Sequence, residues 1–139
     1  MRLMLVILVL IISLSCSFNY CNADGIIIED NLLEQAKKTG FPYCLCIQKA
    51  LKKDETALLQ LIRFAYKTDD VSAIAHGITF TELSLKLGDD FMSIFVSKQK
   101  EEQRLLIAKM FDACMEYREP SINLQIELPK TIQILTNKL

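Results

Sequence analysis

Cysteine is the residue type of this 139-residue chain that is best suited to carry chemistry, and the chain has five cysteines. Cys16 and Cys21 lie in an N-terminal region with the features of an export signal, whereas Cys44, Cys46 and Cys114 lie in the remainder. Cys44 and Cys46 are two residues apart on an expected helix, so their side chains point to nearly opposite sides and disfavour a bond to each other. We therefore predict a disulfide between Cys44 and Cys114, with Cys46 as the alternative partner of Cys114.

This predicted bridge would close a loop of about seventy residues and would stabilise the fold by roughly 3 to 5 kcal/mol in the chain-entropy model. An exported protein meets an oxidising environment in which such a bond persists. The alternative is that all three thiols act as small buried hydrophobes.

His76 is the single histidine of the chain and the natural candidate for a general base. The chain contains the residue types for a thiol nucleophile that His76 activates, and also those for an envelope hydrolase that pairs His76 with a carboxylate. No local motif of either kind surrounds these residues. A metal site would need His76 to converge with the three later cysteines, whose spacing matches no familiar zinc pattern. We predict no catalytic residue, no metal and no cofactor, and we expect His76 to be a packed or half-exposed helix residue.

Three acidic pairs offer carboxylates that suit acid-base hydrolysis by their type. They are Asp69-Asp70, Asp89-Asp90 and Glu101-Glu102. Each pair lies at or near an expected helix start, where a carboxylate caps free amides or interacts favourably with the helix dipole. The pairs therefore predict structural roles, and the sequence contains no Gly-rich phosphate loop and no serine in an elbow motif.

The composition argues against a disordered chain and against a nucleic-acid surface. Apolar residues make up 51% of the chain and charged residues 24%, which is typical of a folded protein. The net charge is −1, whereas a phosphate-binding surface needs an excess of clustered Lys and Arg. We expect no nucleic-acid partner.

The N-terminal segment has the layout of an export signal. Arg2 is followed by an apolar run, Leu3 to Ile12, and then by small or polar residues. This run is shorter than the roughly 20 apolar residues that a membrane-spanning helix needs. An export signal is therefore favoured over a spanning helix.

Two processing sites are open to this signal. Small side chains at Cys21 and Ala23 suit a signal peptidase that cuts before Asp24, which predicts an export signal at 1–23 and a single small helical domain at 24–139. Removing 1–23 takes away one basic residue, Arg2, and no acidic residue, so the net charge of the mature chain would be −2.

The rival is a lipoprotein. The run Ser13-Leu14-Ser15-Cys16 resembles a bacterial lipoprotein processing box, although that pattern prefers Leu where this chain has Ser13. Lipidation at Cys16 would anchor the domain to a membrane through a tether of about eight residues, Ser17 to Asp24, which reaches some 25 Å when extended. The predicted location is secreted or periplasmic, with a membrane-anchored lipoprotein as the alternative.

Helical periodicity dominates the chain up to residue 117. Apolar positions recur at helical spacing in six segments, and acidic or glycine residues mark most of their ends. The predicted helices are 31–38, 42–52, 54 to about 67, 69–87, a short helix over 91–96, and 97–117. The helix 69–87 should be the most surrounded one, and Gly77 within it implies either close packing or a bend.

After Pro120 the pattern changes. Ile122, Leu124, Ile126 and Leu128 alternate with polar residues, as in a strand. Beyond this run, residues 129–139 either form a terminal helix or turn back so that 131–135 pairs as a strand, with residues 25–28 as a third strand. We predict an all-α fold, a compact bundle of about five to six short helices, with an extended or small β segment near the C-terminus.

A small exported helical domain without a catalytic motif is expected to work through its surface. We therefore predict protein-protein binding in the envelope or outside the cell, as an inhibitor, an immunity-type protein or an accessory subunit. One alternative is the envelope hydrolase that uses His76. Another is a small-ligand or lipid carrier whose cavity would be lined by residues 78–87 and 91–96.

Overall fold

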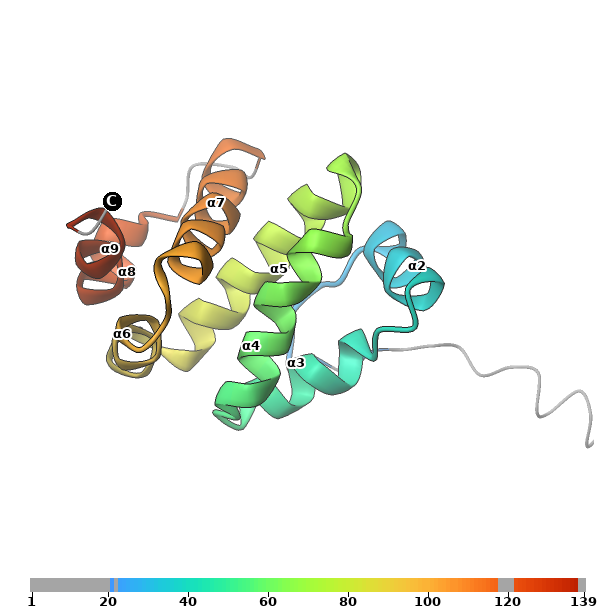
Figure 1. The fold of residues 1–139 in the computed structure, drawn as a ribbon, viewed down its shortest axis with the longest axis horizontal. Coiled ribbons are helices and arrows are strands. Elements are labelled where there is room, and N and C mark those ends of the chain that lie inside the picture. Colours follow the sequence, from blue (N-terminus) through green and yellow to red (C-terminus); the bar gives the residue numbers. More distant parts are fainter. Residues whose placement is uncertain (1–20, 22, 118–121, 138–139) are drawn as a thin grey trace, which may run out of the picture.

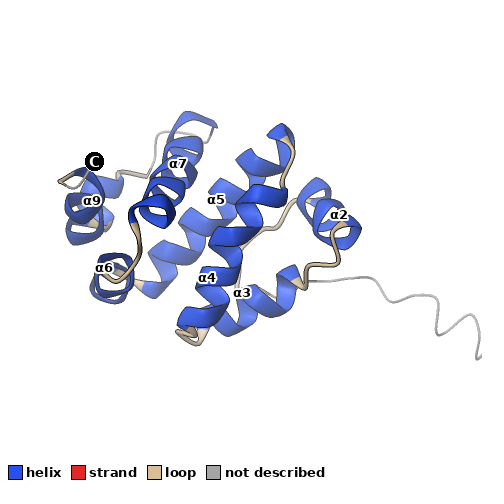
Figure 2. Cartoon of the chain, in the orientation of Figure 1, coloured by secondary structure: helices blue, strands red, loops and turns tan. Residues whose placement is uncertain are grey.

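The computed structural model describes residues 21, 23–117 and 122–137, and all of the regular structure in these residues is helical (Figures 1 and 2). The all-α prediction is confirmed for this part of the chain. It contains eight α-helices rather than five or six, and one short 3-10 helix. The helices are α2 (Asp30–Lys38), α3 (Tyr43–Leu51), α4 (Glu55–Phe64), the 3-10 helix η1 (Ala65–Lys67), α5 (Asp70–Leu87), α6 (Asp89–Ser97), α7 (Glu101–Tyr117), α8 (Leu124–Glu127) and α9 (Pro129–Thr136).

Helix α5 lies at the centre of the arrangement, as its sequence predicts. It packs most extensively against α7 and also contacts α2, α3 and α6. Figure 1 shows α7 on one side of α5 and α2, α3 and α4 on the other. The α6–α9 pair forms the end of the molecule beyond α7.

At Gly77 the helices α5 and α7 approach each other closely. A Cβ atom at this position would lie 2.8 Å from the Met110 carbonyl oxygen and 3.0 Å from the Ala113 Cβ atom. Only a residue without a side chain allows this approach, and α5 continues through it as one helix. Of the two explanations that the sequence leaves open for Gly77, close packing is the one observed.

Acidic caps define the starts of α4 and α5. Asp54 accepts hydrogen bonds from the amides of Thr56 (2.9 Å) and Ala57 (3.1 Å), and Asp69 accepts one from the amide of Ser72 (2.8 Å). The hydrogen bond from the Ser72 amide holds the pKa of Asp69 below its usual value. Both caps confirm the structural role predicted from the sequence.

The predicted strand near the C-terminus is wrong. Residues 124–127 form α8, and burial follows a helical rather than a two-residue period. Leu124 and Leu128, four positions apart, are buried, whereas Ile126 between them is 72% exposed. The alternating sequence pattern therefore does not correspond to one buried face, and residues 25–28 form no strand either.

Asp89 has a different role from the predicted one. The sequence predicts that it caps the helix in which it lies, but α6 begins after Gly88 without a side-chain cap. The Asp89 carboxylate instead accepts hydrogen bonds from the amides of Lys130 (3.0 Å) and Thr131 (2.9 Å) and from the Thr131 hydroxyl (2.8 Å). It thus caps α9, which starts forty residues later in the chain.

The buried apolar side chains form one cluster, which reaches further toward the N-terminus than the predicted domain boundary at residue 24. Ala23 and Ile26 belong to this cluster, and the partly buried Cys21 packs against it. The folded part of the chain therefore includes Cys21 and Ala23.

Candidate functional site

An apolar groove between α7 and the α8–α9 pair is the strongest candidate for a binding site. It has a volume of about 490 Å³ and is open to solvent along one side. Its lining residues come from all three helices and from the two residues before α8. They are Ala108, Phe111, Asp112, Met115, Ile122, Asn123, Leu124, Gln125, Ile132, Leu135 and Thr136.

One face of α7 forms a wall of this groove. Ala108, Phe111, Asp112 and Met115 follow one another at spacings of three, one and three residues, which places them on one side of a helix. The face is apolar except for Asp112, which is exposed, and Met115 is 45% exposed. This wall combines apolar area with one negative charge.

Sequence reasoning missed the groove for two reasons. Met110 and Cys114, which recur at helical spacing on α7, are buried in the core, and the groove face lies beside them. The opposite wall belongs to residues 122–136, of which the sequence pattern predicts 122–128 as extended and leaves 129–139 open between a terminal helix and a strand. The spacing of Ala108, Phe111 and Met115 on one helix face was the signal available in the sequence.

His76 is a buried structural residue in this fold. Its side chain is 1% exposed, its Nδ1 atom lies 2.6 Å from the Tyr43 hydroxyl, and its Nε2 atom lies 2.9 Å from the Leu61 carbonyl oxygen. A carbonyl oxygen only accepts, so Nε2 carries the proton and donates to Leu61, and Nδ1 accepts from the Tyr43 hydroxyl. His76 thus connects α5 to α3 and α4 with both ring nitrogens.

Burial fixes the protonation states of this pair. Desolvation lowers the pKa of His76 from 6.5 to about 4, although the hydrogen bond to Leu61 opposes the shift. Desolvation also raises the pKa of Tyr43 well above its ordinary value. At neutral pH the imidazole and the phenol are therefore both uncharged, and aromatic rings at Phe64 and Phe80 lie around the imidazole.

The disulfide differs from the predicted one. Cys44 is bonded to Cys21, with a Cα–Cα distance of 5.5 Å, and not to Cys114. Cys46 and Cys114 are free thiols that are buried in the fold. The sequence prediction failed because it assigned Cys21 to the removed signal and so never considered it as a partner.

The two free thiols lie in the interior as small hydrophobes do. Desolvation raises the pKa of both Cys46 and Cys114 above the usual value, which keeps them in the thiol form at neutral pH. The Cys46 thiol lies 3.4 Å from the Gln60 side-chain oxygen, to which it donates. In this geometry neither cysteine has the low pKa of a nucleophile.

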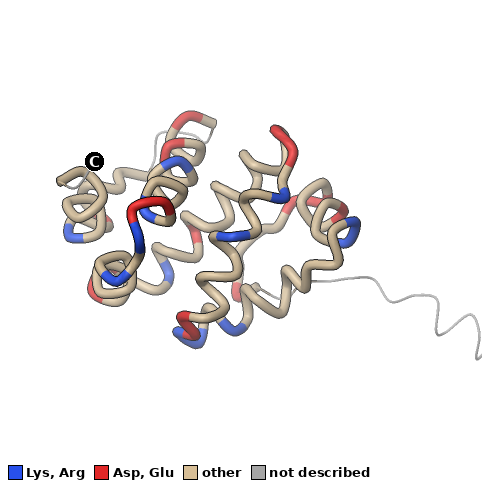
Figure 3. The backbone as a smooth tube through the Cα atoms, viewed as in Figure 1, with Lys and Arg blue, Asp and Glu red and all other residues tan. Residues whose placement is uncertain are grey.

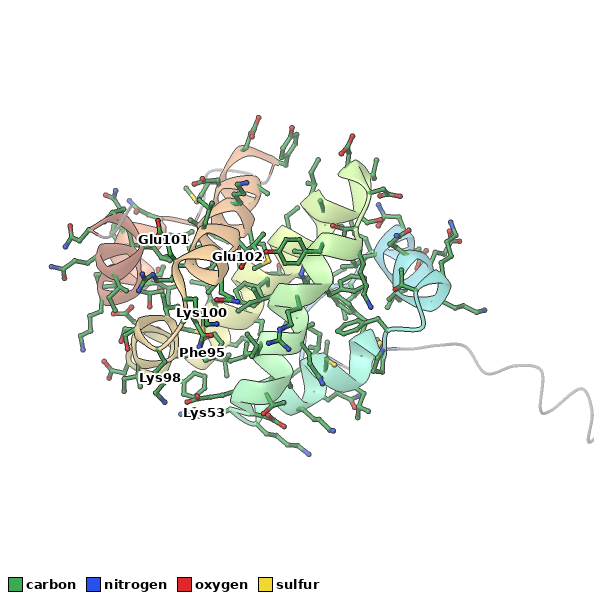
Figure 4. All side chains as sticks on the ribbon, in the orientation of Figure 1. Lys53, Phe95, Lys98, Lys100, Glu101 and Glu102 are labelled. Atoms are coloured by element: carbon green, nitrogen blue, oxygen red, sulfur yellow. A yellow bond between two sulfur atoms is a disulfide. The ribbon has the colours of Figure 1, made fainter. Side chains whose placement is uncertain are left out.

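A second surface lies where α4, α6 and α7 meet, and Figure 4 shows its side chains. The Lys98 ammonium is 2.8 Å from Glu55, and the Lys53 ammonium lies 5.6 Å from the centre of the Phe91 ring. The Lys98 and Glu55 side chains are exposed, so their ion pair contributes little to stability. Acidic and basic residues are interspersed over the helices rather than gathered on one of them (Figure 3).

Glu102 joins α7 to this second surface. The Tyr66 hydroxyl, just after α4, donates a hydrogen bond to its carboxylate, and this bond raises the pKa of Tyr66. The acidic pair at the start of α7 thus contributes a contact between elements.

The side chains expected to line a carrier cavity lie elsewhere. Phe80, Leu83, Met92 and Phe95 are fully buried in the central cluster. Neither they nor the rest of residues 78–87 and 91–96 line the groove of about 490 Å³ or the cavities of about 220, 250 and 700 Å³ found among the described residues.

The predicted processing sites fall in two different places. Ala23 is buried and Asp24 is exposed, so the predicted cleavage bond lies inside the described part of the chain. The candidate lipidation residue Cys16, and residues 1–20 in general, lie outside it. Within the described residues, no helix combines the length and apolarity needed to cross a bilayer, and no three His, Cys, Asp or Glu side chains are grouped to hold a metal ion.

Comparison with protein-family models, with curated proteins and with solved structures finds no match to this chain.

Proposed function

We propose that this chain is an exported binding protein and that the groove between α7 and the α8–α9 pair receives a segment of a protein partner. The observation that carries the proposal is an open apolar groove in a small domain whose other large apolar side chains mostly lie in the core. Apolar area that remains accessible in such a groove gains free energy when a partner covers it.

The shape and lining of the groove favour a protein segment over an enclosed small ligand. The groove is open along its side, and polar side chains at Asn123, Gln125 and Thr136 border its apolar floor. Such groups can pair with the backbone of a bound segment while the floor accepts its apolar side chains. The exposed carboxylate of Asp112 favours a basic residue in that segment.

Two observations support export. The N-terminal segment has the layout of a signal, and the Cys21–Cys44 bond is of a kind that persists in oxidising compartments and is rare in reducing ones. A soluble protein in the periplasm or outside the cell fits both observations, and so does a lipoprotein anchored at Cys16. An inhibitor, an immunity-type protein or an accessory subunit would each use a groove of this kind.

The test compares two exposed apolar positions on the same helix. Met115 lines the groove and is 45% exposed, whereas Leu105 is 42% exposed and does not line it. We expect Met115→Arg to lower the recovery of the partner at least tenfold when the tagged chain is purified from the envelope and secreted fractions of its host, and Leu105→Arg to leave it unchanged. Equal recovery with both variants would exclude the groove as the binding surface.

A further inference from the structure

We infer that the export segment is removed upstream of Cys21, so that Cys21 and Ala23 belong to the mature protein. This inference rests on the proposed export. It changes the predicted mature chain, since cleavage before Asp24 would discard both residues.

The disulfide is the first observation. Cys21 is bonded to Cys44, and the Cα–Cα distance of 5.5 Å is ordinary for a bridge. Its formation removes two protons and two electrons from the two thiols, which thiol-disulfide exchange transfers to the disulfide of an exported oxidoreductase. A chain that begins at Asp24 would lack the partner of Cys44 and would leave that thiol free.

The packing of Ala23 is the second and independent observation. Ala23 is 2% exposed and belongs to the core cluster, and its carbonyl oxygen accepts a hydrogen bond from the Ile26 amide at 3.0 Å. This bond spans the turn at Asp24 and Gly25, where both residues have positive φ angles of 52° and 80°. Cleavage after Ala23 would remove its methyl group from the core and its carbonyl oxygen from the hydrogen bond with Ile26. It would also place the charged amino group of Asp24 next to the buried site that Ala23 occupies.

The sequence offers a suitable bond further upstream. Ser13 and Ser15 are small residues three positions and one position before Cys16, which is the pattern that a signal peptidase requires. Hydrolysis there adds water across the Ser15–Cys16 amide, which leaves a carboxylate on Ser15 and an amino group on Cys16. A soluble form and a lipoprotein would share this bond, so both keep Cys21.

Retention of Cys21 also shortens any tether. If Cys16 is the first residue, four residues separate it from Cys21, which the bond to Cys44 fixes at the start of α3. This length of chain reaches at most about 17 Å, compared with some 25 Å for the tether expected from the sequence. A mature chain that starts at Cys16 would therefore have its first residue within this reach of Cys21.

Pulse labelling of the chain in its host distinguishes the two candidate cleavage sites, Ser15–Cys16 and Ala23–Asp24. Ser15→Arg blocks a cut before Cys16, and Ala23→Arg blocks a cut before Asp24. We expect the precursor to accumulate for Ser15→Arg and to be processed at the normal rate for Ala23→Arg. Processing is measured within the pulse, so a folding defect of the Ala23 variant does not affect the result. Normal processing of Ser15→Arg together with precursor accumulation for Ala23→Arg would overturn the inference.

Intact-mass measurement of the purified wild-type protein gives a second reading. We expect a chain that starts at Cys16, with or without a diacylglyceryl group, and that is two hydrogen atoms lighter than its reduced form. A start at any residue after Cys21 overturns the inference and leaves the proposed export intact. An unprocessed mass from Met1 with all thiols reduced overturns both.

Discussion

At the scale of single residues, the pair Tyr43 and His76 determines how three helices are held together. The pair is buried, and each member supplies the hydrogen-bond partner that the other needs. A buried polar group that loses its partner costs more free energy than the hydrogen bond itself contributes, because the group was removed from water. Substitutions at these two positions should therefore have large effects.

Tyr43→Phe should lower the free energy of unfolding by about 1 to 3 kcal/mol, because His76 Nδ1 would remain buried without a donor. Urea denaturation measures this loss. Tyr66→Phe is the matched control, since it removes an exposed hydrogen bond to Glu102 and should change stability little. A Tyr43 variant as stable as the Tyr66 variant would show that the buried bond does not stabilise the fold.

The buried imidazole should also make stability depend on pH. The pKa of His76 is about 4 in the folded state and 6.5 in the unfolded state, so the unfolded state binds the proton first. The stabilisation that the neutral His76 gives the folded state is complete above pH 6.5. It is lost as the pH falls from 6.5 to 4, which lowers the free energy of unfolding by about 3 kcal/mol in total. Hydrogen bonds lower the pKa of carboxylates such as Asp69 and Asp89, so their stabilising contribution is lost mainly toward the acid end of this range and below it.

The variant His76→Gln tests this origin directly. Its side chain can accept from Tyr43 and donate to Leu61 but does not titrate. Unfolding free energies measured at intervals from pH 7 to pH 4 should therefore show a clearly shallower slope than in the wild type. Parallel slopes in both proteins would assign the pH dependence to other groups.

The role of His76 was predictable from the sequence only in part. The sequence predicts a packed or half-exposed helix residue, and in the structure His76 is packed and buried. Its partners Tyr43 and Leu61 lie 33 and 15 positions away, so no local pattern identifies them. The same limit applies to Cys21, whose bond to Cys44 depends on where the folded chain starts.

At the scale of elements, the attachment of α9 depends on a carboxylate from α6. Asp89 satisfies two amides at the start of α9 and one hydroxyl. Partial burial raises the pKa of this carboxyl, but the hydrogen bonds from Thr131 and Lys130 outweigh that effect and lower it. Since α9 forms one wall of the groove, this contact also positions the proposed binding site.

Asp89→Ala should destabilise α9 by about 1 to 2 kcal/mol, the usual cost of losing a helix cap. Hydrogen exchange of the amides in residues 130–136 should accelerate, whereas that of α4 should not. Asp89→Asn keeps one acceptor oxygen and should give an intermediate rate, and Asp90→Ala removes only the exposed ion pair to Lys130. Unchanged exchange in the alanine variant would mean that packing alone holds α9.

Gly77 gives a second prediction about elements. In an exposed helix Gly→Ala gains about 1 kcal/mol, but here the new methyl group meets the Met110 carbonyl oxygen. We expect Gly77→Ala to lose about 1 to 3 kcal/mol as α5 and α7 are forced apart. Val71→Ala, on the exposed start of α5, is the control with little change, and a more stable Gly77 variant would contradict the close approach.

Helix prediction succeeded where local signals coincide and failed where they do not. The segments from α2 to α7 combine helical periodicity with caps such as Asp54 and Asp69, so their presence follows from the sequence. In residues 122–128 the alternating pattern suggests a strand, but Leu124 and Leu128 are buried as one helix turn. The Asp89 carboxylate that caps α9 is too distant in the chain for a local sequence pattern to identify it.

At the scale of the whole molecule, the fold joins a disulfide corner at α2 and α3 to a groove at the opposite end, with α5 and α7 between them. The sequence predicts the fold class and the central helix. It does not predict the groove, because one wall lies in the misread C-terminal segment. The proposed partner-binding site therefore follows from the structure and the proposed export from the N-terminal sequence.

Site-specific photo-crosslinking in the host tests the proposed binding groove most directly. A benzophenone side chain placed at Met115 should form one discrete adduct of higher mass with a protein partner, and the same group at Leu105 should form none. The adduct should disappear when excess unlabelled wild-type protein competes for the partner. No adduct at Met115, or the same adducts at both positions, would contradict binding through the groove.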